Sequence, residues 1–214
     1  MAGGSSSKRS SAQGAWLGSE VGEEHIEALR HHWLLPSASQ VLVRLCGAET
    51  APTPYVGEVV VFTEHFYRGF VLPANAFFSE WLRFFGLQPH HLAPNAILQL
   101  SAFVILCEGF VGIEPRVDLW RSLFFSKQQS IAMEKSEMPL QQSIKQWQKG
   151  FFYVKNADLT LGALNMPPFN IDPPARLNWA AKTPKPIPEV ALICAHLETL
   201  EKSGLLGRGL LPLW

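Results

Sequence analysis

The spacing of apolar and polar residues predicts an amphipathic helix in the centre of the chain. Between Pro73 and Gly86, large apolar side chains recur on one side of a 3.6-residue period, and polar side chains fall on the other. The side chain of Asn75 suits the capping position of the first turn, and Gly86 suits the left-handed residue that ends a helix. The apolar side holds Phe77, Trp81, Phe84 and Phe85, and the polar side holds Ser79, Glu80 and Arg83.

A second central helix is predicted from Ala96 to about Phe110, opened by Pro94 and stopped by Gly109 and Gly112. This segment is almost entirely apolar. We therefore expect it to be buried nearly all round and to form the central helix of the core. The polar residues within it are Gln99, Ser101 and Glu108.

Three other segments show helical spacing. They cover residues 19–34, residues 115 to about 128, and residues 188 to about 204. Each is bounded by proline or glycine, which are the residues that start or stop helices. In the last segment the apolar positions are Val190, Ile193, Cys194, Leu197 and Leu200.

Three short runs have the composition of β-strands: Gln40–Cys46, Val59–Phe62 and Phe151–Lys155. Together with the helices they predict a mainly α fold with a few short β-strands, in a single globular helical domain over residues 19–206. Residues 1–18 are rich in serine and glycine and predict a disordered N-terminal tail, and residues 207–214 form a short C-terminal tail.

The segment 162–188 is rich in proline, and we expect it to be extended and irregular. Proline lacks a backbone N–H and fixes one backbone angle, so such a run does not continue a helix or a central strand. Phe169 and Trp179 are the large apolar side chains that would hold this segment against the surface.

Composition excludes several classes of protein. Hydrophobic residues make up 47% of the 214 residues and charged residues 17%, which argues against global disorder. Lysine and arginine balance aspartate and glutamate at 18 each, so the chain lacks the basic excess of a dedicated duplex-DNA binder. The apolar run Ile97–Cys107 is about half the length that spans a bilayer, so no membrane partner is expected.

Three cysteines, Cys46, Cys107 and Cys194, stand far apart and form no pair with zinc-ligand spacing. Cys107 and Cys194 lie in apolar helical patterns and are expected to be buried reduced thiols. An odd cysteine count without a secretory signal favours an intracellular location, nuclear or cytoplasmic.

Several longer runs of sequence resemble one known family. The runs are Gly57–Pro73, Phe84–Ala96, Cys107–Pro115, Asp118–Trp120, Trp147–Asn156, Met166–Phe169 and Pro188–Ala191. Together they resemble the gypsy-type transposon domain found in plant genomes, over roughly residues 55–206. The resemblance implies a retrotransposon-derived protein and brings no established activity, cofactor or catalytic residue with it.

Two features depart from the family pattern. The segment between Gln128 and Pro139 is shorter than in relatives, which often carry a β-prone segment there, so the strand Phe151–Lys155 is expected to have lost one likely partner. Relatives also commonly continue beyond the last helix into long polar or coiled-coil sequence. Both departures suggest a truncated or decayed copy of the element.

The residues do not assemble an enzyme motif. A metal-dependent transposase needs three converging carboxylates, and this chain has three aspartates, Asp118, Asp158 and Asp172, in unrelated settings. No Asp-Thr-Gly or Asp-Ser-Gly protease motif, phosphate loop or zinc knuckle occurs. We expect no enzymatic activity, no cofactor and no metal site.

Histidines offer no better candidates. The pairs His31-His32 and His90-His91 are adjacent in sequence, so their side chains point in different directions and are expected to make local hydrogen bonds or lie at the surface. Glu64-His65 has the residue types of an acid–base pair, but no nucleophile or orienting group accompanies it. We interpret it as the start of a helix.

A basic and aromatic segment is the candidate for nucleic-acid contact. Residues 127–155 carry five lysines against Glu134 and Glu137, a net charge of +3. Basic side chains with interleaved aromatic rings can hold single-stranded nucleic acid, because bases stack on the rings. Burial of the aromatics in the core with a solvated fringe of lysines is the alternative. The candidate contact residues are Lys145, Trp147, Lys149, Phe151, Tyr153 and Lys155.

These observations lead to one hypothesis with two alternatives. The first is a non-catalytic, transposon-derived domain that acts in protein–protein association or self-association, since aromatic residues are enriched at interfaces as well as in cores. A nucleic-acid-binding module that uses residues 145–155 is the second. A decayed element without a selected function is the third.

Overall fold

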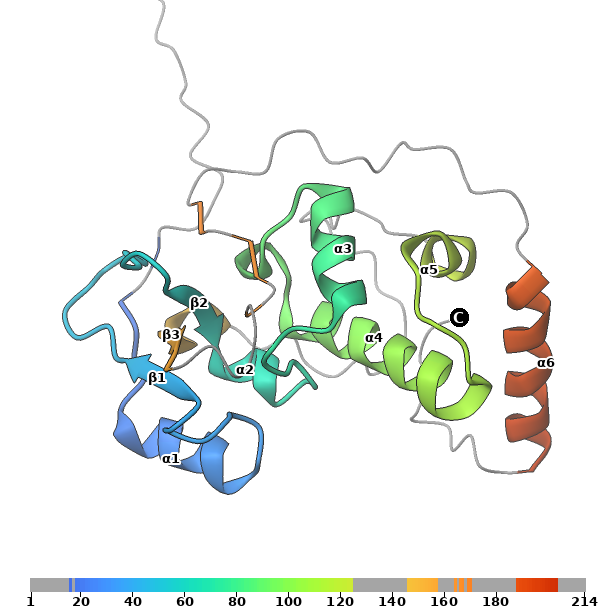
Figure 1. Cartoon of the computed structure of the whole chain (residues 1–214), viewed down its shortest axis with the longest axis horizontal. Coiled ribbons are helices and arrows are strands. Elements are labelled where there is room, and N and C mark those ends of the chain that lie inside the picture. Colours follow the sequence, from blue (N-terminus) through green and yellow to red (C-terminus); the bar gives the residue numbers. More distant parts are fainter. Residues whose placement is uncertain are drawn as a thin grey trace, which may run out of the picture.

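The computed structural model describes residues 16, 18–124, 146–157, 164, 166–167, 169–170 and 188–203. The predicted C-terminal tail lies outside these residues, as do nearly all of the predicted N-terminal tail and most of the proline-rich segment. Lys145 and Trp179 lie outside them as well. Within the described part, the sheet and its flanking helix lie at one end of the molecule and the last helices at the other (Figure 1).

The sheet has three antiparallel strands, β1 (Val41–Arg44), β2 (Val59–Phe62) and β3 (Phe151–Asn156), in the order β1-β3-β2. β3 is therefore the central strand and pairs along its length with both neighbours. The expected loss of one likely partner therefore does not leave this strand unpaired. Its partners come from the N-terminal third of the chain, and pairing between segments so far apart leaves no local signal in the sequence.

The two faces of the sheet build two separate clusters of buried side chains. Side chains alternate between faces along each strand. One face packs against the helices in the main core, which includes Val41, Val61, Phe152 and Val154. The opposite face carries a smaller cluster, made of Cys46, Val60, Phe62, Trp147, Phe151 and Tyr153.

The helices follow the predicted order. They are α1 (Glu23–His31), α2 (Thr63–Phe66), α3 (Ala76–Phe85), α4 (Pro94–Ile105), α5 (Val117–Leu123) and α6 (Pro188–Lys202). Short turns of other types are η1 (Pro89–His91), the π-helix η2 (Leu106–Val111) and η3 (Trp147–Gly150). The mainly α fold with a few short strands is confirmed.

Both ends of α3 confirm the signals in the sequence. The side chain of Asn75 accepts a hydrogen bond of 2.8 Å from the backbone N–H of Phe77, which satisfies one of the unpaired donors of the first turn. Gly86 ends the helix with φ of 64°, in the left-handed region that glycine adopts without steric cost. Apolar positions on the predicted side, Phe77, Trp81 and Phe85, are buried.

α4 differs from its prediction. The side formed by Ile97, Leu100 and Phe103 is buried in the main core, but Leu98 and Ile105 are 41% and 58% exposed. The prediction of burial nearly all round is therefore wrong. A helix that is apolar on every side does not show, from its sequence alone, which sides other elements will cover. Together with η2 this helix is long and apolar enough to cross a membrane, and its buried side belongs to the core.

α5 and α6 pack together at the end of the molecule opposite the sheet (Figure 1). An ion pair joins them, because a guanidinium nitrogen of Arg116 lies 3.2 Å from the Glu189 carboxylate. Ile193 of α6 is fully buried in the main core. α6 begins at Pro188 and ends at Lys202, as its apolar spacing predicts.

Candidate functional site

The aromatic residues of the predicted nucleic-acid segment are buried. Phe151 and Tyr153 are 0% exposed and Trp147 is 9% exposed. The Trp147 ring lies 4.9 Å from the ring of Phe62 and 5.0 Å from that of His65, measured between centroids. These rings therefore serve as core, and a base could stack on them only if the smaller cluster opened.

The two described lysines of this segment make contacts away from the rings. Lys149 forms an ion pair of 2.5 Å with Glu20, in the segment that precedes α1. Lys155 is exposed near the end of β3, where its aliphatic chain lies beside Gly57. Among the candidate contact residues that the structure describes, the lysines and the buried rings therefore do not form one basic and aromatic surface.

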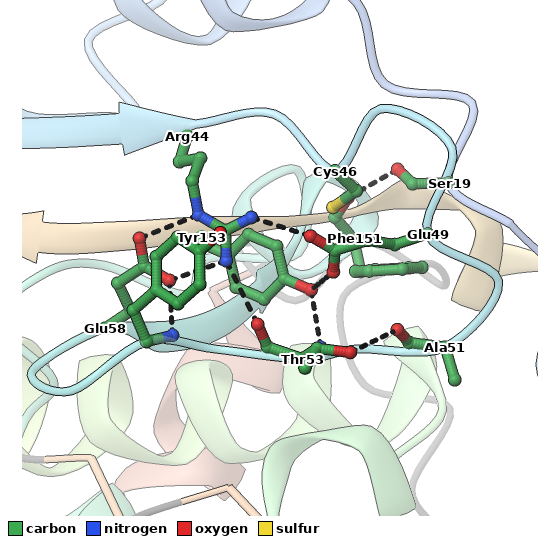
Figure 2. Close-up of polar contacts among 10 residues, drawn as sticks. Ser19, Arg44, Cys46, Glu49, Ala51, Thr53, Glu58, Phe151 and Tyr153 are labelled. Carbon is green, nitrogen blue, oxygen red and sulfur yellow. Dashed lines mark hydrogen bonds and ion pairs between the residues drawn. The ribbon is translucent and has the colours of Figure 1, made fainter.

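A different cluster on the same face of the sheet has the most extensive polar contacts, and Arg44 lies at its centre (Figure 2). Nε and Nη2 of Arg44 donate to the two carboxylate oxygens of Glu58 at 2.8 and 2.7 Å, in a bidentate pair. Nη1 donates to Glu49 at 2.7 Å, and Nη2 also donates to the carbonyl of Thr53 at 3.1 Å. Each nitrogen of the guanidinium is thus engaged.

Two tyrosine rings enclose this guanidinium. Its central carbon lies 3.8 Å from the centroid of the Tyr153 ring and 4.1 Å from that of Tyr55. The hydroxyl of Tyr153 donates to Glu49 and accepts a hydrogen bond of 2.6 Å from the backbone N–H of Thr53. The cluster, which we call the Arg44 clamp, holds the connection between β1 and β2 against the sheet.

Protonation states in the Arg44 clamp follow from these contacts. The hydrogen bonds from Arg44 hold the pKa of Glu58 below its usual value, despite partial burial. At Glu49, burial raises the pKa, but hydrogen bonds from Tyr153 and Arg44 lower it by more. The pKa of Glu49 is therefore also below its usual value. Burial and the hydrogen bond to Glu49 raise the pKa of Tyr153. Both carboxylates are therefore ionised, and each forms an ion pair with Arg44.

The buried thiols in this structure are poor nucleophiles. Sγ of Cys46 donates to the carbonyl of Phe151 at 3.2 Å, and burial raises the pKa of this thiol to about 11. Burial also raises the pKa of Cys107 to about 11. Since the thiolate is the reactive form, both residues are present as thiols at neutral pH. Cys107 is buried as predicted, whereas Cys194 is partly exposed.

His65 is a buried histidine and the third residue of α2. Its Nε2 lies 3.1 Å from the carbonyl oxygen of Leu92, and the ring packs between Phe62 and Trp147. Burial lowers the pKa of His65 to about 3, so the neutral ring donates this hydrogen bond at physiological pH. The prediction that Glu64 and His65 belong to the start of a helix is confirmed.

The rings of the adjacent histidines of η1 contact each other, with centroids 3.9 Å apart, so the expectation that they point in different directions is wrong. Nδ1 of His91 accepts a hydrogen bond of 3.0 Å from the backbone N–H of Gln88, which is the local bonding that was expected. The His90 ring packs 5.5 Å from Trp16 and 5.1 Å from Phe169, measured between centroids. Phe169 thus attaches its part of the proline-rich segment to the smaller cluster, as predicted. Among the residues that the structure describes, no group of three or more His, Cys, Asp or Glu side chains could hold a metal ion.

Sequence reasoning missed the Arg44 clamp. A weak signal exists, since Arg44 is the one charged residue in the apolar run Gln40–Cys46, and such a charge in a half-buried strand needs a partner. The partners Glu49 and Glu58 follow within the same connection. Tyr153 could not be found this way, because it comes from a strand far along the chain.

Comparison with known proteins identifies one part of the chain. Residues 59–128 match a family model described as "Putative gypsy type transposon". This segment belongs to the gypsy-type transposon family. The gypsy-type segment begins at β2 and includes α3, α4 and α5, whereas β1 and β3 lie outside it. The predicted resemblance is confirmed for these residues, and the plant origin stays a prediction.

The whole chain matches no curated protein and no solved structure. The gypsy-type match therefore gives a transposon-derived family without a biochemical role. Any role has to be argued from the surfaces of this structure.

Proposed function

We propose that this chain is a non-catalytic, transposon-derived domain that associates with a second copy of itself through α4. The observation that carries this proposal is an exposed apolar surface on the gypsy-type segment, which we call the α4 surface. It consists of Leu98 and Ile105 on α4, with Tyr67 and Val71 on the loop beside them. Large apolar side chains exposed together are typical of interaction sites.

The loop that carries two of these residues approaches α4 between the other two. Leu98 and Ile105 are two helical turns apart and share one side of α4, with Ser101 between them. Gly69 contacts this point closely, since a Cβ added there would lie 2.9 Å from Cβ of Ser101. The loop that carries Tyr67 and Val71, which are 49% and 52% exposed, therefore runs beside the helix at the middle of the stripe.

Charge favours a second copy as the occupant. The 12 residues of α4 include no Asp, Glu, Lys or Arg, so two copies of this helix would meet without like-charge repulsion. The whole chain has 18 basic and 18 acidic residues and hence no net repulsion between copies. A self-complementary patch of this kind suits the two-fold symmetry of a homodimer.

The non-catalytic part of the proposal is supported by the state of the reactive groups described above. The carboxylates of the Arg44 clamp are both paired with Arg44, the Cys46 thiol is buried, and the His65 ring is hydrogen-bonded to the carbonyl of Leu92. Each group has a structural partner.

The nucleic-acid alternative has less support. Its aromatic platforms, Trp147, Phe151 and Tyr153, are in the smaller cluster, and Lys149 pairs with Glu20. It predicts binding of labelled single-stranded RNA or DNA that is strongest at low salt and weakens as salt rises. An absence of binding at low salt excludes it.

Size-exclusion chromatography with light scattering tests self-association. The single chain has a mass of 23.8 kDa, and we expect the average mass to rise toward twice this value between low and high micromolar concentration. A constant single-chain mass over that range excludes the proposed function. It would favour the third hypothesis, a decayed element without a selected role.

A further inference from the structure

A groove of about 450 Å³ runs between α1 and β1, at the end of the molecule away from α6. One wall is a single side of α1, formed by Glu23, Ile26 and Arg30 at helical spacing. The other wall is the consecutive stretch 41–45 of β1 and the residue after it. Successive strand residues point to opposite faces, so a groove lined by all of them follows the edge of the strand rather than one face.

This edge of β1 presents free backbone groups at Val43, whereas the N–H of Val41 donates to the carbonyl of Ser37 at 3.0 Å. β1 pairs with β3 and with no other strand among those the structure describes. The backbone N–H of Ala157 donates to the carbonyl of Gln40. The register therefore directs the backbone N–H and C=O groups of Leu42 and Arg44 toward β3, and those of Val43 away from it. No hydrogen bond to the outward N–H or C=O of Val43 occurs within the described part of the chain.

The groove contains a basic and an apolar side chain next to each other. Nη2 of Arg30 lies 3.5 Å from the carbonyl of Val41, at the limit of a hydrogen bond, and Nε of Arg30 has no partner among the described residues. The apolar contact next to it is the half-exposed Leu42 on β1, since Ile26 is buried in the main core. The groove therefore offers an apolar contact and an incompletely satisfied cation side by side.

We propose that this groove binds an extended peptide, which adds as a strand to β1 and carries a carboxylate that pairs with Arg30. In such strand addition, main-chain hydrogen bonds supply affinity and pockets for alternate side chains supply specificity. Here the main-chain contact is Val43. The proposal is independent of self-association through α4, because the two surfaces share no residue.

The position of Arg30 beside β1 defines the peptide further. Arg30 lies beside the carbonyl of Val41, two residues before Val43 on the same edge. Residues i and i+2 of a strand are about 6.8 Å apart and lie on the same side. The peptide that fits therefore carries an Asp or Glu two residues from the residue that pairs with Val43.

Fluorescence anisotropy with a labelled octapeptide tests this proposal on the full chain. The peptide alternates threonine and valine and carries one aspartate two residues from the central valine. We expect saturable binding, and about tenfold or greater weakening when Arg30→Gln removes the cation. A matched peptide with lysine in place of aspartate should bind the unmodified chain more weakly. Its affinity should rise when Arg30→Gln removes the like charge.

Two changes isolate the main-chain contact. N-methylation of the peptide amides next to the valine removes their donors without altering the protein, and Val43→Pro removes the outward donor at an edge position that tolerates proline. We expect each change to abolish binding, with circular dichroism confirming that the variant is folded. Binding that survives N-methylation, or that is unchanged by Arg30→Gln, overturns the proposal.

The same variants separate the possible occupants. If Val43→Pro lowers the mass in light scattering, the edge of β1 pairs with a second copy, and the peptide proposal is overturned. Ile105→Glu should leave peptide binding unchanged, so a failure of self-association through α4 would be recognised separately.

Discussion

Arg44 and Tyr153 are direct partners across β1 and β3, and the guanidinium carbon lies 3.8 Å from the centroid of the tyrosine ring. The pair joins contacts between residues close in sequence to contacts between residues far apart in sequence. Arg44 binds Glu49 and Glu58 in the connection that follows it, and Tyr153 brings the central strand to the same point. The connection between β1 and β2 is thereby fixed to the sheet.

The first prediction concerns the central cation. Arg44→Met should lower the free energy of unfolding by about 2–4 kcal/mol, because Glu58 and Glu49 are left as partly buried charges without their partner. Arg44→Lys keeps the charge but loses the bidentate geometry. Its free energy of unfolding should therefore lie between those of the unmodified chain and Arg44→Met. Urea unfolding followed by circular dichroism measures the change. Arg83→Met, at an exposed position of α3, is the control, and an equal loss in both methionine variants would contradict the role of the clamp.

The second prediction concerns the close approach of Gly69 to α4. Gly69 has φ of 90°, and an added Cβ would lie 2.9 Å from Cβ of Ser101. Gly69→Ala should therefore cost more stability than Gly47→Ala, whose position has φ of 56° and open space around it. We expect about 1 kcal/mol at Gly47 from backbone strain and about 1–3 kcal/mol more at Gly69.

A double variant isolates the steric part of that difference. Ser101→Gly removes the atom that the new Cβ would meet, so it should recover part of the stability lost in Gly69→Ala. Thermal unfolding of the single and double variants gives the coupling between the positions. The close contact is refuted if Gly69→Ala unfolds at the same temperature as Gly47→Ala.

The third prediction concerns pH. The folded-state pKa of His65 is about 3, whereas the ordinary value is 6.5, so below pH 6.5 the unfolded chain takes up a proton that the folded chain does not. The stability associated with neutral His65 is thus complete above pH 6.5 and is lost as pH falls toward 3. The maximal slope is about 1.4 kcal/mol per pH unit for one group.

Urea midpoints at pH 7, 6 and 5 measure this dependence. His65→Gln should show a shallower loss of stability over that range, since one proton fewer is taken up on unfolding. His90, whose pKa burial also lowers to about 3, continues to contribute in the variant. Equal slopes for the variant and the unmodified chain would show that His65 is not held neutral.

The fourth prediction orders the cysteines by reactivity. Cys46 and Cys107 are buried, with pKa values raised to about 11, and Cys194 is partly exposed on α6. Iodoacetamide at pH 8 should therefore modify Cys194 first, and the other two only after unfolding. Peptide mass spectrometry of native and urea-treated samples gives the order. Early modification of Cys46 would mean that the smaller cluster opens in the native state.

The helices could be predicted from the sequence where their signals are local. Asn75 and Gly86 mark the ends of α3, and Pro188 marks the start of α6, because caps and proline act within one turn. The exposure of Leu98 and Ile105 could not be predicted. It depends on which elements pack against α4, and no local spacing records that.

The candidate site was less accessible to sequence reasoning. The run Phe151–Lys155 was identified as a strand, but its position between β1 and β2 depends on segments that the chain brings together from far apart. That central position is the reason that Phe151 and Tyr153 are buried rather than available to bases. The Arg44 clamp was missed for the same reason, since Tyr153 joins it only once the sheet has formed.

The most direct test of self-association through α4 is sedimentation equilibrium of two matched variants. Ile105→Glu places a charge on the α4 surface, and Val56→Glu places the same charge at a 96% exposed apolar residue outside it. Exposed positions tolerate such changes within about 0.5 kcal/mol, so both variants should fold. We predict that the unmodified chain and Val56→Glu show a mass that rises toward 2 copies, whereas Ile105→Glu stays at 23.8 kDa. Equal association of Ile105→Glu and the unmodified chain would contradict the account.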